Sequence, residues 1–348
     1  MSGQITLVTG ATGSLGNNLV KALLDDGDRV AVFKRHAEPL GAIAEVRADI
    51  EVRFGDVRDS ASVAAAMTGV RRVYHLAGLV SPLDRYEQEM IQVNGLGAHT
   101  VALEALRASV ERVVHVSSTA AIGYPPDHAV ADEGFEGNES VADTGYARSK
   151  RLGEQMVLGL AVAGLDVVVV NPSAVIAPGG PNLRHGWAEL VDAVARGRVR
   201  VYPPGGSAFC AAADLVDGLR AAMRVGRTGH RYILSTCNLS YREFIALISE
   251  VAGVAVPSRQ VPRHLLGAAG RVGGLVGRIA PPDRVPPIAP ETINLMRRYL
   301  FYDQSKAVLE LGMQQTSLRE AIQDTLTWCE GLRVGRGPKR GSHERQAA

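Results

Sequence analysis

Apolar and polar positions alternate in blocks along the first half of the chain. Short, almost continuous apolar runs predict buried strands at residues 5–9, 29–33, 52–54, 72–76, 113–116 and 166–170. Between such runs, apolar residues recur at helical spacing, as they do from Leu19 to Leu24. Strands that alternate with helices favour a parallel sheet covered by helices on both faces. The sequence therefore predicts the α/β class with a doubly wound sheet.

The second half of the chain has a weaker pattern. It predicts a strand at residues 231–234 and helices near residues 187–196, 241–251 and 317–330. We expect residues 1–180 to form the sheet domain, with some later segments returning to it, and residues 181–330 to form a smaller, mixed lobe. The tail at residues 335–348 is basic and poor in apolar residues, so we expect it to be disordered.

A glycine-rich turn joins the first strand to the first helix. It reads Gly10-Ala11-Thr12-Gly13-Ser14-Leu15-Gly16. Glycines let the backbone turn tightly and approach a pyrophosphate, and the helix that follows offers free N–H groups and the positive end of its dipole. This order of strand, turn and helix predicts a Rossmann-type nucleotide-binding sheet. The cofactor contacts expected from this turn are Gly10, Thr12, Gly13, Ser14, Leu15 and Gly16.

Two cations end the second strand. A protein that binds NAD would place an acidic residue there for the ribose 2′-hydroxyl, but this chain has Lys34 and Arg35. A pair of cations suits a 2′-phosphate, so the sequence favours NADP(H) over NAD(H). The alternative is a solvated pair of charges at a strand end.

Other strand ends carry small or polar residues. Asp56 follows the third strand and is positioned to accept a hydrogen bond from an adenine amino group. Ala77 and Gly78 follow the fourth strand and leave room for a cofactor. Ser118 and Thr119 belong to a hydroxyl cluster after the fifth strand. Because ligands bind beyond the carboxyl ends of parallel strands, we expect these residues to meet.

Tyr146 and Lys150 lie four residues apart on a predicted helix, on the same face. An ammonium near the phenol would lower the pKa of Tyr146 toward neutrality. Such a tyrosine gives a proton to a developing alkoxide or takes one from an alcohol. The alternative is a surface tyrosine beside a surface lysine.

With these motifs in place, the chain resembles an extended short-chain dehydrogenase/reductase over residues 4–330. The motifs that carry the resemblance are Thr9-Gly10-x-x-Gly13-x-x-Gly16, Gly55-Asp56-Val57, His75-Leu76-Ala77-Gly78, Val93-Asn94, Ser117-Ser118-Thr119, Tyr146-x-x-x-Lys150 and Asn171-Pro172.

The resemblance implies roles for single residues. Tyr146 would be the acid/base, and Lys150 would bind the nicotinamide ribose. Thr119, or less readily Ser118, would hold the substrate carbonyl, and Asn94 would support a proton relay. The resemblance also implies a homodimer, and it places along the cofactor Val57, Leu76, Val116, Pro172 and Val175.

Two differences from the family's nucleotide-sugar and NAD-retaining enzymes indicate which branch of the family the chain resembles. The nucleotide-sugar enzymes often carry an arginine in the segment that matches residues 206–214, and this chain has none there. Lys34 and Arg35 also differ from the acidic residue of enzymes that retain NAD. The chain is most similar to the dihydroflavonol reductase and 3β-hydroxysteroid dehydrogenase branch, which implies an NADP(H)-dependent oxidoreductase acting on an apolar ketone, aldehyde or alcohol. The alternatives are a nucleotide-sugar epimerase or dehydratase with bound NAD(P) and a non-catalytic NADP-binding sensor.

Bulk properties exclude several other classes. The net charge of +2 gives no reason to expect nucleic acid binding. The three cysteines are widely spaced and predict neither a metal site nor a disulfide framework. The sequence shows no secretion signal and no apolar run long enough to span a membrane, so a cytoplasmic protein is expected. Residues 261–280, with basic and apolar residues mixed, would touch a membrane surface, cap an apolar pocket or form a helix of the second lobe.

Overall fold

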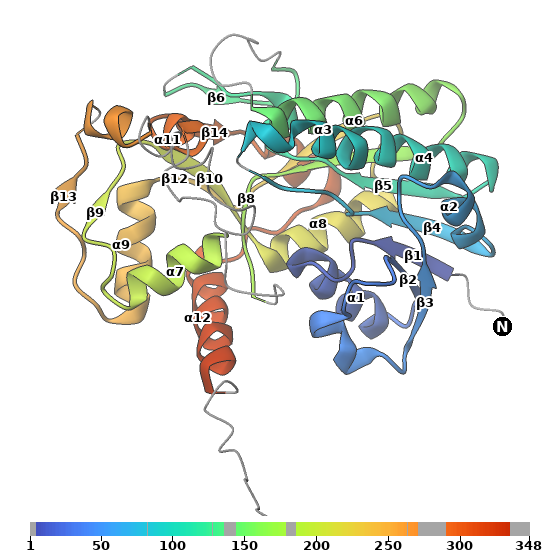
Figure 1. Ribbon diagram of the computed structural model, residues 1–348, viewed down its shortest axis with the longest axis horizontal. Helices are drawn as coiled ribbons and strands as arrows, with labels where there is room; N and C mark the ends of the chain where they lie inside the picture. The colour runs from blue at the N-terminus through green and yellow to red at the C-terminus, as the bar shows by residue number, and fades with distance from the viewer. Residues whose placement is uncertain are drawn as a thin grey trace, which may run out of the picture.

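The computed structural model describes residues 5–81, 83–126, 128–135, 144–178, 186–262, 264–270 and 290–334. The expected tail at 335–348 and part of the segment 261–280 lie outside these residues. A parallel sheet of seven strands forms the larger part of the molecule (Figure 1). In spatial order its strands are β11 (Arg231–Leu234), β7 (Val167–Pro172), β5 (Arg112–Val116), β4 (Val70–His75), β1 (Ile5–Thr9), β2 (Arg29–Lys34) and β3 (Ile50–Phe54).

Helices cover both faces of this sheet, so the predicted doubly wound α/β fold is confirmed. On one face lie α1 (Ser14–Asp25) and α8 (Ala212–Val225); on the other lie α2 (Ser60–Ala66), α4 (Ala98–Arg107) and α6 (Gly145–Val162) (Figure 1). Each layer has its own apolar core, with Leu19 and Leu215 packed on one side and Val101 and Val157 on the other.

The direction of strand order changes at β1, which pairs with β2 on one side and β4 on the other. This change leaves a crevice beyond the carboxyl ends of β1 and β4, where open α/β sheets bind ligands. The chain after β4 enters this region as a continuous run of short elements: η2 (Asp84–Tyr86), α3 (Glu87–Met90), the π-helical turn η3 (Ile91–Gly97) and then α4.

The remaining elements form a smaller, mixed part of the molecule. A second sheet contains β12 (Cys237–Ser240), β10 (Gly206–Ala211), β14 (Tyr299–Tyr302) and β6 (Val130–Ala131), with β8 (Ala174–Ile176) paired to β10. The helices α7 (Trp187–Ala195), α9 (Tyr241–Ala252) and α12 (Leu318–Val334) pack together beside it, and Phe209 and Phe244 stack at 4.0 Å in their core.

Four further short elements are η1 (Gly41–Val46), α5 (Thr119–Ile122), α11 (Pro290–Met296) and η4 (Ala307–Leu311). A separate pair of strands, β9 (Val201–Tyr202) and β13 (Arg259–Gln260), lies at the outer edge of the smaller part (Figure 1). Although α8 and β11 lie beyond residue 180, they belong to the large sheet and its helical layer, while the domain boundary near residue 180 stays a prediction.

Candidate active site

The glycine turn is shaped by close backbone contacts. Gly10 has a φ of +69°, and a Cβ atom there would lie 2.6 Å from the backbone nitrogen of Ala77. At Gly16 a Cβ atom would lie 2.3 Å from the carbonyl oxygen of Gly10. The turn therefore packs directly against the end of β4, with no space for a side chain at Gly10 or Gly16. Helix α1 starts at Ser14, and its N-cap residue, Gly13, provides no side-chain cap. A closely packed glycine cradle at a helix start fits the pyrophosphate of a dinucleotide.

Two hydroxyl groups tie this turn to its surroundings. Ser14 Oγ donates a hydrogen bond to the carbonyl oxygen of Pro178 at 2.9 Å, which brings the turn against the segment after β8. Thr12 Oγ1 donates to a carboxylate oxygen of Glu38. Leu15 and Val175 pack on the same apolar cluster under the sheet. The structure thus brings together the predicted contacts of the turn and of the region after Pro172.

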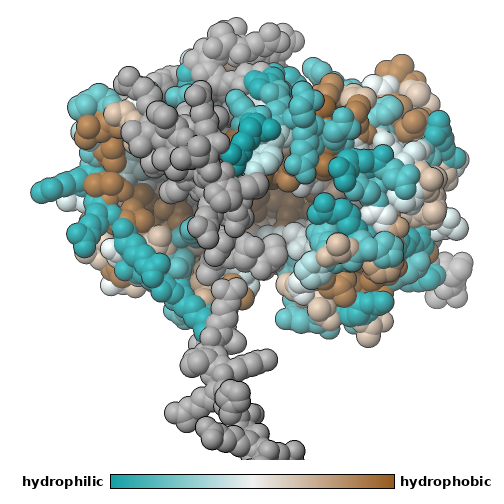
Figure 2. Space-filling model, viewed as in Figure 1, coloured by the Kyte–Doolittle hydropathy of each residue, from teal (hydrophilic) through white to brown (hydrophobic). Residues whose placement is uncertain are grey.

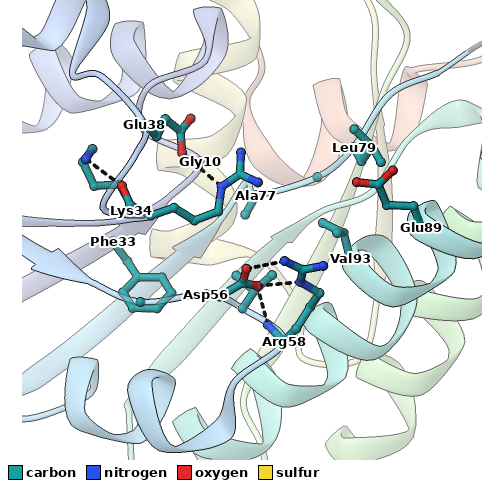
Figure 3. Close-up of a pocket in the computed structure, with 14 residues that line it drawn as sticks. Gly10, Phe33, Lys34, Glu38, Asp56, Arg58, Ala77, Leu79, Glu89 and Val93 are labelled. Atoms are coloured by element: carbon teal, nitrogen blue, oxygen red, sulfur yellow. Dashed lines mark hydrogen bonds and ion pairs between the residues drawn. The ribbon is translucent and has the colours of Figure 1, made fainter. Parts of the chain in front are cut away.

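A pocket lies beyond the ends of β1 and β2, with the residues expected at an adenosine end of the cofactor (Figure 3). Its two predicted cations are placed differently. The Lys34 side chain is buried, donates to the carbonyl oxygen of Arg35 at 2.7 Å and lies 5.0 Å from the ring centre of Phe54. The side chain of Arg35 is 64% exposed, with Glu38 3.7 Å away. Of the two, Arg35 is the cation free to turn toward a phosphate.

Asp56 has a partner that the sequence analysis missed. Its carboxylate accepts hydrogen bonds from Arg58 at 2.9 Å (Nε) and 2.6 Å (a terminal nitrogen), and a third from the Arg58 backbone N–H (Figure 3). These bonds lower the pKa of Asp56. Arg58 stands two residues after Asp56 in the sequence, so this pairing could have been predicted from the spacing. Val57 and Ala77 line the same pocket.

The side chains of Asn94 and Lys150 both approach Gly78, which follows β4. The Asn94 side chain accepts from the N–H of Leu79 at 2.7 Å, and it donates to the Leu79 carbonyl at 2.8 Å and to Ser149 Oγ at 3.0 Å. The Lys150 ammonium donates to the carbonyl oxygen of Val116 at 3.0 Å. A Cβ atom on Gly78 would lie 3.1 Å from Asn94 Oδ1 and 3.2 Å from Lys150 Nζ. Gly78 is therefore the point where these two side chains converge.

Helix α6 presents Tyr146 beside Ser118. Thr144 caps this helix by accepting a hydrogen bond from the N–H of Ala147 at 3.1 Å. The Ser118 hydroxyl interacts with the Tyr146 phenol and acts to lower its pKa, but desolvation by the surrounding protein is the larger effect and raises that pKa. The expectation that Lys150 lowers the pKa of Tyr146 is wrong for this structure, because burial outweighs the polar neighbour and the ammonium is bound to Val116.

The two candidate hydroxyls have separate partners. Thr119 is buried and interacts with the hydroxyl of Tyr302, which in turn donates to the carbonyl oxygen of Gly123 at 2.7 Å. Ser118 caps α5 and lies beside Tyr146. The structure therefore puts Ser118, the second choice from the sequence, next to the phenol of Tyr146. It also places Tyr302 beside Thr119, a contact that no local sequence pattern predicted.

Two absences apply to the described part of the chain. Its residues contain no group of three or more His, Cys, Asp or Glu side chains placed to hold a metal ion. Among the same residues, no helix has both the length and the apolar character that a membrane crossing requires.

Comparison with known proteins identifies relatives along nearly the whole chain. Residues 6–235 match the NAD dependent epimerase/dehydratase family. A protein of Methylococcus capsulatus named sterol demethylase protein B is 35% identical over 323 residues, which are 93% of this chain and 97% of that protein. A putative dihydroflavonol 4-reductase of Synechocystis is 31% identical over 332 residues, 92% of this chain and 93% of that protein.

Solved structures share the fold. The crystal structure of gox2253 superposes with a TM-score of 0.80 at 29% identity, covering 96% of this chain and 100% of that one. A UDP-glucose 4-epimerase of Thermotoga maritima superposes with a TM-score of 0.75 at 17% identity, covering 94% and 99%, and shows the fold alone. The chain therefore belongs to the NAD-dependent epimerase/dehydratase family, the extended short-chain dehydrogenase/reductases, and is an NAD(P)-dependent oxidoreductase of that type.

Proposed function

We propose that this protein is an NADP(H)-dependent oxidoreductase that interconverts a ketone or aldehyde and an alcohol on an apolar small molecule. The observation that carries the proposal is the convergence of Tyr146, Ser118 and Lys150 beyond the end of β5, opposite the glycine cradle. These groups supply a proton donor, a second hydroxyl and a cation in one crevice.

The residues of this site have different roles at the substrate oxygen. A bound nicotinamide supplies or accepts the hydride. As negative charge grows on the carbonyl oxygen, the hydroxyls of Tyr146 and Ser118 donate hydrogen bonds to it, and Tyr146 delivers its proton. Lys150 supplies a positive charge at the crevice, where it would bind the nicotinamide ribose. Thr119 supports this arrangement through Tyr302.

The preference for NADP(H) rests on the charges of the adenosine pocket. Arg35 is exposed at the pocket, and Arg58 is held by Asp56 on its other side. Each guanidinium suits a phosphate through parallel N–H donors. At the end of β2, where an NAD-binding protein would place an acidic residue for the ribose 2′-hydroxyl, this chain has Lys34 and Arg35.

An apolar substrate is supported by the surroundings of the crevice. The whole of β10 is buried and carries no arginine for a nucleotide diphosphate. Figure 2 shows apolar residues in the recess between the larger and smaller parts of the molecule. Relatives include a ketoreductase of Stigmatella aurantiaca at 28% identity, over 88% of this chain and 91% of that protein. A homodimer and a cytoplasmic location also stay part of this proposal.

The test is a titration of the purified protein with NADPH and NADH, followed by oxidation of the preferred cofactor with a panel of apolar ketones. We expect NADPH to bind at least about tenfold more tightly, because a charge-assisted phosphate contact contributes roughly 1.5–3 kcal/mol. Turnover should disappear in Tyr146→Phe. A cofactor that does not dissociate, or NADH binding as tight as NADPH binding, would favour epimerase or dehydratase chemistry over the proposed carbonyl reduction.

A further inference from the structure

A buried carboxylate lies one helical turn beyond Lys150. Glu154 is 3% exposed and follows Lys150 on the same face of α6. One of its oxygens accepts a hydrogen bond from Arg231 at 3.0 Å, and the other accepts from Asn171 at 2.7 Å. A buried charge of this kind is costly unless it is paired and hydrogen-bonded, and here both oxygens have partners.

Asn171 fixes the direction of this carboxylate. Its amide nitrogen donates to Glu154 and also to the carbonyl oxygen of Ser118 at 3.0 Å. The opposite orientation of the amide would put its oxygen against a carboxylate and a carbonyl, so the two contacts select one rotamer. Glu154 is thereby linked through Asn171 to the turn that carries Ser118.

Arg231 anchors the other side of the carboxylate. It comes from β11, the last strand of the large sheet, and also donates to the carbonyl oxygen of Glu133. The Glu133 carboxylate in turn accepts from the N–H of Ile233 at 2.8 Å. The carboxylate of Glu154 is therefore held between two strands and cannot swing away from Lys150 without breaking both contacts.

Lys150 needs such a partner because its surroundings oppose a positive charge. Burial lowers the pKa of Lys150 to about 8, and Glu154 acts in the other direction. The titratable groups that face it from β4 and β5 are His75 and His115, both held neutral by burial, and Tyr146 lies on its own helix. Among these groups Glu154 is the negative charge that favours the ammonium.

We propose that Glu154 is a positioning residue that keeps Lys150 in its charged form beside the cofactor crevice. The proposal rests on the function proposed above for Lys150. It assigns Glu154 an electrostatic task, transmitted to the reaction through the lysine, rather than contact with the substrate. Asn171 serves this task by fixing the direction of the carboxylate, whereas Arg231 compensates part of its negative charge.

The test measures the titration of Lys150 directly. The chain contains five lysines, so protein labelled with ¹³C at lysine gives few side-chain signals, and Lys150→Met identifies the one in question. In Glu154→Gln the pKa of Lys150 should fall by about one unit, because an opposite charge nearby contributes roughly one to three units. In Arg231→Gln it should rise, because a cation is removed and Glu154 acts without its partner.

Glu87→Gln is the matched control. Glu87 binds Arg148 of the same helix at 2.6 Å on its outer side, so this variant breaks an ion pair of α6 without touching the buried network. Its Lys150 titration should equal that of the wild type. A general loosening of α6 would move all three variants alike, whereas the proposal requires opposite signs for the two network variants.

An unchanged Lys150 pKa in folded Glu154→Gln would overturn the proposal. If that variant does not fold, Arg231→Gln decides, and absence of a rise there overturns the proposal as well. Because the titration needs no substrate, a wild-type protein that reduces no ketone would defeat the proposed function and leave this result intact.

Discussion

The hydroxyl of Tyr302 donates a hydrogen bond of 2.7 Å to the carbonyl oxygen of Gly123. Tyr302 ends β14 of the smaller sheet, and Gly123 ends the short helix α5, which starts at Thr119. The same phenol interacts with the Thr119 hydroxyl. A strand from the C-terminal third of the chain therefore supports the turn that carries the candidate hydroxyls, so the smaller sheet contributes to the geometry of the site.

Tyr302→Phe should lower the free energy of unfolding by about 1–3 kcal/mol, because it leaves the buried carbonyl of Gly123 without its donor. It should also reduce turnover, since Thr119 loses its partner. Urea unfolding and ketone reduction measure the two effects. The control is Tyr299→Phe on the same strand, where the partly exposed ring lies tilted against His128 and remains after substitution. Equal stability of both variants would contradict the role given to Tyr302.

The glycine turn makes a prediction that depends on backbone space. Gly10→Ala and Gly16→Ala should each cost more than about 2 kcal/mol and abolish cofactor binding, because a Cβ atom would lie within 2.6 Å of the Ala77 nitrogen or 2.3 Å of the Gly10 oxygen. Gly13→Ala should be much milder in stability, since its Cβ atom would meet the Gly10 oxygen at 3.4 Å. Thermal unfolding without cofactor compares the three, and an equal loss at Gly13 would refute the steric account.

The parts of the fold that follow local rules were predictable from the sequence. The strands of the large sheet, the glycine turn and α6 each carry a pattern within a few residues and lie close to where they are expected, whereas the strands of the smaller sheet were not predicted. The contacts of Glu154 with Arg231 and of Thr119 with Tyr302 join residues 77 and 183 positions apart, and no local spacing encodes such pairs.

The different environments of Lys34 and Arg35 could likewise not be predicted from the sequence. Lys34 is buried and lies over Phe54 of the neighbouring strand, whereas Arg35 is exposed, and this difference depends on a contact between strands. The raised pKa of Tyr146 has the same origin, because desolvation depends on everything that surrounds the phenol rather than on the lysine one turn away.

Arg35→Ala and Arg58→Ala should each weaken NADPH binding by about 10–100-fold and change NADH binding little, because each removes a charged donor worth roughly 1.5–3 kcal/mol to a phosphate. Arg58→Ala also leaves Asp56 without its partner, so the pKa of that carboxyl should return toward its ordinary value. Fluorescence titration with both cofactors measures the effect. Lys21→Ala, which removes a surface cation paired with Glu45 away from the pocket, is the control. Equal loss of NADPH and NADH would argue against a 2′-phosphate site.

The buried pair His75 and His115 should make the protein sensitive to mild acid. Their rings stack at 5.2 Å, burial lowers the pKa of His75 to about 3, and it lowers that of His115 well below the ordinary 6.5. Both are neutral in the folded protein, whereas the unfolded chain binds protons below about pH 6.5. The unfolded state therefore gains protons first, and stability falls as the pH drops from 6.5 toward 3.

Urea unfolding at a series of pH values tests this dependence, and the window from pH 6.5 to 5 is decisive because carboxylates dominate below about pH 5. His115→Leu should flatten the decline in that window. It should cost little at pH 8, since neither ring nitrogen of His115 has a hydrogen-bond partner among the described residues and an apolar side chain suits the site. His99→Gln, on the partly exposed side of α4, should leave the decline unchanged. A wild-type stability that is flat from pH 8 to 5 would show that the two buried imidazoles are not neutral in the fold.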